Sequence, residues 1–273
     1  MKSRRFLNSR VTAVVENEWN QLLRNKVIIF TTIAPPLLLV LLSIAMLLLS
    51  TFVDENLSSV SGPAAALVGG EGSALSAMTG ADSIRAALVS PFVLLFQLIP
   101  LVVPITIASY SIVGEKQSRS LEALLATPIR TWELLLGKAL AAAIPGVLAT
   151  WYSYLTFVVV ARFTVSDVVF NEVVLSRPWV LSMAVLTPLF TLLAVGLGIL
   201  ISSKVRDVQS AQQLGSLVIL PVVGALVGQV TGAVQINVGL IAGTALGLLV
   251  VDALVILFTV QLFGRENILT KWR

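Results

Sequence analysis

The residue types that usually carry out chemistry are scarce in this sequence. Of its 273 residues, 14 are Asp or Glu, and none is histidine or cysteine. Without these two types there is no His-ligated zinc or haem site, no Ser-His or Cys-His nucleophile pair and no disulfide. The one Gly-Lys pair, Gly137-Lys138, has Trp132 where a GxxxxGK phosphate loop needs glycine, and Ala139 where it needs Ser or Thr. We therefore expect that the chain is not an enzyme and does not hydrolyse ATP by itself. We also expect that it binds no cofactor and no metal.

Asp252 is the single charged residue in the long apolar stretch 208–264. A carboxylate in the middle of a membrane span is costly and is by default a functional candidate. One carboxylate cannot form the dyad of an aspartyl protease, and a proton relay needs a series of acids and bases. Asp252 can equally hydrogen-bond to a neighbouring hydroxyl or amide, and we favour this structural role.

The segments that carry these residues are predicted to lie in a membrane, because 57% of the residues are hydrophobic and only 12% are charged. Four uncharged intervals each exceed the ~20 apolar residues that cross a bilayer core. The stretch 208–264 is long enough to cross twice, folding back at 229–237 as a turn or a re-entrant element. We predict an all-α integral membrane protein in one domain over 1–273, with an external loop at 54–87. Its six spans are expected at about 27–53, 88–113, 138–161, 179–203, 213–231 and 238–263.

Lysine and arginine are distributed unevenly about these predicted spans. Of the 18 Lys and Arg residues, only Arg85, Arg162 and Arg177 fall on the side opposite the termini. Because cytoplasmic segments carry the excess of basic residues, both termini are predicted to be cytoplasmic. We attribute the net charge of +4 to this topology and not to nucleic-acid binding.

Residues 10–26 are predicted to form an amphipathic entry helix before the first span. Its apolar side chains share one helical face, at Val11, Val14, Val15, Trp19, Leu22 and Leu23. We expect Val15, Trp19 and Leu22 to form the contact face, with Trp19 at the depth of the lipid headgroups. The helix is either a membrane anchor or an element that transmits force, and amphipathicity alone does not separate the two.

The stretch 114–138 contains two short helical patterns between the second and third predicted spans. Ser118 or Ser120 is suited to cap the first helix, and Pro128 ends it. Thr131 is suited to cap the second helix. We therefore predict a pair of short cytoplasmic helices.

This stretch resembles the ABC-2 type permeases, which are the membrane subunits of ATP-binding-cassette (ABC) exporters. In that family the pattern Glu-x-x-x-Gly-Thr-Leu-Glu-x-Leu-Leu-x-x-Pro, followed by Glu-Leu-Leu-x-Gly-Lys, comes after the second span. Residues Glu115–Lys138 are similar, with Arg119 in place of the glycine and Ser120 in place of the threonine. The entry helix, the six spans and the lack of nucleotide-binding motifs are also similar to the family.

The resemblance implies a type V exporter-like fold and a permease that pairs with itself or with a homologous permease. It implies two copies of a separate ATPase subunit, which bind ATP and Mg, and a location in the plasma membrane of a prokaryote. The residues implied to couple to the ATPase are Glu115, Arg119, Leu121, Glu122, Pro128 and Arg130. The alternative for this stretch is a solvated loop whose charged residues only follow the rule that basic residues lie on the cytoplasmic side. The alternative function is a nucleotide-independent secondary transporter or a membrane assembly factor, and the substrate stays open among lipids, drugs, peptides, polysaccharides and ions.

Glycines recur at every fourth residue in the two last predicted spans. They are Gly224, Gly228 and Gly232 in the fifth span and Gly239, Gly243 and Gly247 in the sixth. Because small residues let helices approach closely in lipid, we expect these glycines to pack the two spans against each other. A contact between two copies of the chain is the alternative.

Overall fold

The computed structural model describes residues 2–51, 81–117, 131–205 and 207–262, and every regular element in these ranges is helical. Six segments in this part of the chain are long and apolar enough to cross a membrane. They are Lys26–Thr51, Asp82–Glu115, Trp132–Thr164, Arg177–Lys204, Val208–Val230 and Val238–Thr259. The predicted all-α class and the six predicted spans are thereby confirmed.

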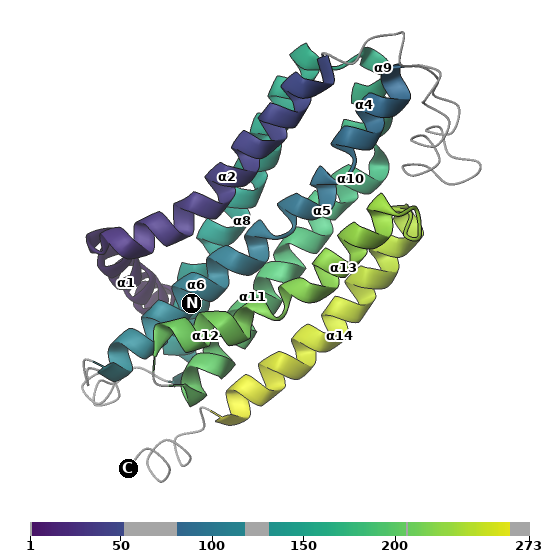
Figure 1. Cartoon of the computed structure of the whole chain (residues 1–273). Coiled ribbons are helices and arrows are strands. Elements are labelled where there is room, and N and C mark those ends of the chain that lie inside the picture. Colours follow the sequence, from purple (N-terminus) through teal and green to yellow (C-terminus); the bar gives the residue numbers. More distant parts are fainter. Residues whose placement is uncertain (1, 52–80, 118–130, 206, 263–273) are drawn as a thin grey trace.

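The chain begins with two helices that meet at a sharp bend (Figure 1), α1 (Lys2–Arg24) and α2 (Lys26–Thr51). Asn25 lies between them. Its Oδ1 accepts hydrogen bonds from the backbone N–H groups of Val27 at 3.0 Å and Ile28 at 3.4 Å. An asparagine in this role caps the first turn of the following helix, so the chain can change direction without leaving these amides unpaired. The entry helix was predicted over 10–26, and α1 begins eight residues earlier, at Lys2.

The second span is broken into three helices, α4 (Ala81–Val89), α5 (Phe92–Phe96) and α6 (Ile99–Gln117). Pro91 lies in the first break, where its missing N–H interrupts the helical hydrogen bonds. Pro100 lies in the first turn of α6, where no such hydrogen bond is needed. α4 begins at Ala81, so helical structure starts within the predicted external loop 54–87 and earlier than the predicted start of the second span at 88.

The third span is one continuous helix, α8 (Thr131–Thr164). The second of the two predicted short helices is therefore not a separate element, because it runs on without a break into the span. The first predicted short helix lies outside the described residues.

The fourth span includes one stretch of wider π-helix, and a second stretch precedes it. The segments after α8 are α9 (Asp167–Val169), η3 (Phe170–Val174), α10 (Arg177–Leu181), η4 (Ser182–Leu186) and α11 (Thr187–Lys204), with η3 and η4 being the π-helices. The fully buried Gln97, at the second break of the second span, donates from Nε2 to the carbonyl oxygen of Ser182 at 3.0 Å and to its Oγ at 2.9 Å. Its Oε1 accepts from Thr187 Oγ1 at 3.4 Å. The irregular parts of the two spans thus satisfy each other's polar groups inside the bundle.

The last two spans are α12 (Val208–Ser216) with α13 (Ile219–Val230), and α14 (Val238–Leu262). The segment between α13 and α14 is a short turn and not a re-entrant helix. Gly232 adopts φ 76° there, a backbone conformation that glycine accepts without strain. The N–H of Val234 closes the turn by donating to the carbonyl oxygen of Gly228 at 2.8 Å.

At the centre of the bundle α6 packs between α11 and α8. On its two sides α2 packs against α8 and α14 packs against α11, so α2 and α14 form opposite edges of the molecule (Figure 1). One end of the bundle carries α1 and α12, and we call it the α1 end. The opposite end carries α9 and the turn between α13 and α14, and we call it the α9 end.

The glycine ridges do not pack α13 against α14, which corrects our expectation. A Cβ added at Gly224 or Gly243 would meet no other atom within 4 Å. One added at Gly228 would lie 2.6 Å from the side chain of Val234 in the turn, and one at Gly239 would meet only the Asn237 side chain, at 3.3 Å. The two helices have different neighbours, since α13 packs on α5 and α14 on α11.

Candidate functional site

A buried ionic cluster lies at the α1 end, where α1, α6 and α8 meet. Lys138 Nζ of α8 lies 2.5 Å from Glu18 Oε1 of α1 and 2.7 Å from Glu115 Oε1 of α6. It also donates a hydrogen bond of 2.7 Å to Ser111 Oγ of α6. We call these four residues the Lys138 cluster. Three helices that are distant in sequence thus share one ammonium group.

Helical spacing and one glycine bring these groups together. Ser111 and Glu115 are one turn apart on α6, and Glu18 follows Val14 by one turn on α1. Gly137 precedes Lys138 on α8, and a Cβ at this glycine would lie 2.6 Å from Val14 Cγ1. Because Gly137 has no side chain, α1 approaches α8 closely enough for Glu18 to reach Lys138.

The cluster is almost completely shielded from solvent. The charged side chains are only 4–7% exposed. Buried charges are costly to desolvate, and they are tolerated when an opposite charge and additional hydrogen bonds satisfy them. Lys138 has two carboxylates and a hydroxyl as acceptors for its three donors, so all of its donors can be used.

The cluster lies close to the two helix ends that flank residues 118–130, most of the stretch predicted to contact an ATPase. Glu115 is near the end of α6 at Gln117, and Lys138 is two turns from the start of α8 at Thr131. Residues 118–130 connect these two helices. A further contact holds α1 in place, since Trp19 Nε1 donates to the carbonyl oxygen of Ala141 at 3.1 Å. A displacement of the connecting segment would therefore act on α6, α8 and α1 together.

The predicted coupling residues divide into two groups. Glu115 is buried in the Lys138 cluster and is 6% exposed, so its side chain faces the interior of the bundle. The others, Arg119, Leu121, Glu122, Pro128 and Arg130, lie outside the described residues. Their predicted role stays a prediction.

The predicted contact face of the entry helix is turned toward the bundle. Trp19 binds α8 as described above, Leu22 packs against the larger apolar core and Val15 is half-buried. Our sequence analysis missed Glu18, which lies at the centre of that face. Glu18 could have been found from its position seven residues after Val11, which places it on the same apolar face. An acidic residue on such a face needs a buried partner of opposite charge.

Asp252 lies on α14 and is 4% exposed, between the buried Leu248 and Val255 on the same helical face. Neither of its carboxylate oxygens has a hydrogen-bond partner among the described residues. The hydrogen bond that we expected for Asp252 is therefore not formed within this part of the chain.

The comparison with known families agrees with this architecture. Residues 12–242 match the model of a family described as ABC-2 family transporter protein. No curated protein sequence matches the chain. The matched region extends from α1, through the Lys138 cluster, into α14, and so includes the whole candidate site. The chain therefore belongs to the ABC-2 family of transporter proteins, as a transmembrane permease.

Proposed function

We propose that the chain is the permease subunit of an ABC exporter, which forms the translocation pathway and couples to a separate ATPase subunit. The complex would contain two permease chains, identical or homologous, and two ATPase subunits that bind ATP and Mg. We place it in the plasma membrane of a prokaryote, with the α1 end and both termini in the cytoplasm. The charge asymmetry of the sequence supports this orientation.

The Lys138 cluster is the observation that carries the proposal. An ATPase that closes on ATP would push on residues 118–130, and the force would enter α6 and α8 at their ends. The ion pairs of Lys138 join both helices to α1. Because α1 continues through Asn25 into α2, the first span would move with them. A buried ion pair suits this role because its geometry permits few alternative registers.

Charge reversal at Glu122 tests the coupling in the reconstituted complex. We expect Glu122→Lys to abolish ATP-driven transport into vesicles, while the variant still inserts and the ATPase still hydrolyses ATP. The matched control is Glu71→Lys, the same change in the predicted external segment, which should transport normally.

Two results would contradict the proposal. The first is wild-type transport by Glu122→Lys. The second is transport by the purified permease alone on an ion gradient, which would favour a secondary transporter. A complex with a catalytically inactive ATPase gives the baseline for both measurements.

A further inference from the structure

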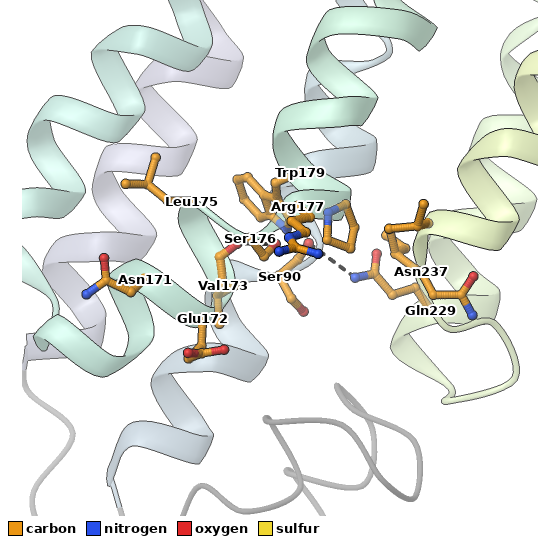
Figure 2. A pocket seen from close by; sticks show the side chains of 13 residues that line it. Ser90, Asn171, Glu172, Val173, Leu175, Ser176, Arg177, Trp179, Gln229 and Asn237 are labelled. Atoms are coloured by element: carbon orange, nitrogen blue, oxygen red, sulfur yellow. Dashed lines mark hydrogen bonds between the residues drawn. The ribbon is translucent and has the colours of Figure 1, made fainter.

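A cavity of about 530 Å³ opens at the α9 end, away from the Lys138 cluster. Three separate parts of the chain line it: Ser90 at the first break of the second span, residues 171–179 of η3 and α10, and the end of α13 with the start of α14. Figure 2 shows these side chains around the cavity, with Arg177 between Trp179 and Gln229. Its size is in the range of binding sites for small molecules.

The walls of this cavity are held in place by contacts with the bundle. Trp179 stacks on Phe157 of α8 at a ring distance of 5.6 Å. Tyr154 donates its hydroxyl hydrogen to the carbonyl oxygen of Val174 at 3.0 Å. From the other side Gln229 Nε2 donates to the carbonyl oxygen of Ser90 at 3.2 Å, as the dashed line in Figure 2 shows. These contacts fix the positions of the cavity walls relative to the bundle.

Two opposite charges line the cavity without neutralising each other. Arg177 and Glu172 are exposed, and neither forms an ion pair with another described residue. The cavity is also lined by Gln229, which is 5% exposed and whose Oε1 has no hydrogen-bond partner in the described part of the chain. A buried acceptor without a donor is unfavourable, so a ligand that donates a hydrogen bond to it would be favoured. The cavity thus offers a cation, an anion and a buried acceptor to a ligand.

We propose that this cavity binds a zwitterionic phosphate ester that carries a primary ammonium group. The guanidinium of Arg177 matches the geometry of a phosphate, with which it can form two parallel hydrogen bonds. The ammonium group can donate hydrogen bonds to the Glu172 carboxylate or to Gln229 Oε1, both of which line the cavity. Trp179, Leu175 and Ile236 provide an apolar wall for the hydrocarbon part of the ligand. A purely anionic ester would meet the carboxylate of Glu172 unfavourably.

Two sources offer this chemistry, the headgroup of phosphatidylethanolamine and soluble phosphoethanolamine. The inference depends on the proposed function in one respect: the proposed orientation places the cavity at the outer leaflet. Phospholipid headgroups of that leaflet lie at the depth of Trp179. It needs neither the ATPase nor transport.

The test is a titration of the whole purified chain in detergent, followed by native mass spectrometry. The probes are phosphatidylethanolamine, phosphatidylglycerol and diacylglycerol with identical acyl chains, and soluble phosphoethanolamine. We expect the ethanolamine ester to bind about tenfold more tightly than the other two lipids, since it alone carries both a phosphate for Arg177 and an ammonium group for Glu172. Arg177→Gln should lose about tenfold in affinity for it, and Glu172→Gln should abolish its advantage over phosphatidylglycerol.

Arg162→Gln is the matched control. Arg162 is also an arginine at the α9 end, but it pairs with Asp167 at 2.7 Å and does not line the cavity. Its variant should bind like the wild type. Arg177-dependent binding of phosphoethanolamine but not of the lipid would assign the site to a soluble ester. The proposal is overturned if Arg177→Gln and Arg162→Gln bind all probes equally, or if diacylglycerol binds as well as the ethanolamine lipid. If the complex failed to transport while the chain still bound the ethanolamine ester as expected, the proposed function would be contradicted and the proposed binding site would stand.

Discussion

One ammonium group balances two carboxylates in the Lys138 cluster, and this unequal ratio makes Lys138 its most sensitive member. Glu18 and Glu115 both lie within 2.7 Å of Lys138 Nζ. Without the lysine, two buried carboxylates would remain close together with no cation. Loss of one carboxylate would still leave an ion pair.

We predict that Lys138→Met lowers the free energy of unfolding by about 3–5 kcal/mol, the usual cost of an uncompensated buried charge. Adding Glu18→Gln and Glu115→Gln should recover most of this loss, because no buried charge then remains. The measurement is denaturant unfolding in detergent micelles. Lys204→Met is the control, since Lys204 is exposed at the end of α11 and should change stability by less than about 0.5 kcal/mol. Equal effects of the two lysine variants would refute the role of the cluster.

The contact between α1 and α8 depends on Gly137. A new Cβ at this position would lie 2.6 Å from Val14 Cγ1 and 2.7 Å from Val14 Cβ. Rotation of the Val14 side chain moves the first of these atoms but not the second. An added methyl group must therefore push the two helices apart, which would also separate Glu18 from Lys138.

Gly137→Ala should accordingly destabilise the chain by about 1–3 kcal/mol, the typical cost of overpacking. Val14→Ala in the same chain should restore part of the loss by removing the clashing γ-methyl groups. Gly243→Ala is the matched control, because its Cβ would have open space. That control should be neutral or more stable by up to ~1 kcal/mol, since alanine favours the helix. The three variants are compared by denaturant unfolding, and a Gly137→Ala protein as stable as Gly243→Ala would contradict the close packing of α1 on α8.

The orientation of the molecule in its membrane can be tested directly, because the chain has no cysteine. Ala233 lies in the turn between α13 and α14 at the α9 end, and Gln209 lies in the first turn of α12 at the α1 end; both are exposed. Single cysteines at these positions would therefore report on opposite sides of the membrane.

We expect a membrane-impermeant maleimide to label Ala233→Cys in intact cells. Gln209→Cys should be labelled only after the cells are permeabilised, because basic segments at the α1 end stay in the cytoplasm. The opposite labelling pattern would invert the proposed orientation. It would leave the six spans and the family unchanged.

Several features were predictable from the sequence because they depend on local composition. A stretch of apolar residues longer than a bilayer needs lipid around it wherever the rest of the chain lies, so the six spans were confirmed. The position of the turn after α13 followed from its polar residues. The breaks around α5 and the continuous α8 were not predicted, since a helix adapts to the helices that pack beside it.

The amino-acid sequence by itself determined how many times the chain crosses the membrane and which segments do so, because solvation by lipid is a property of each segment. The tertiary structure alone decided which distant residues meet. Glu18 and Lys138 are 120 positions apart, and their ion pair exists only because Gly137 lets α1 approach α8. In the same way Gly224 of α13 and Gly243 of α14 face open space, and the cavity beside Arg177 is formed by three distant segments. These arrangements depend on packing between helices, and no local pattern contains that information.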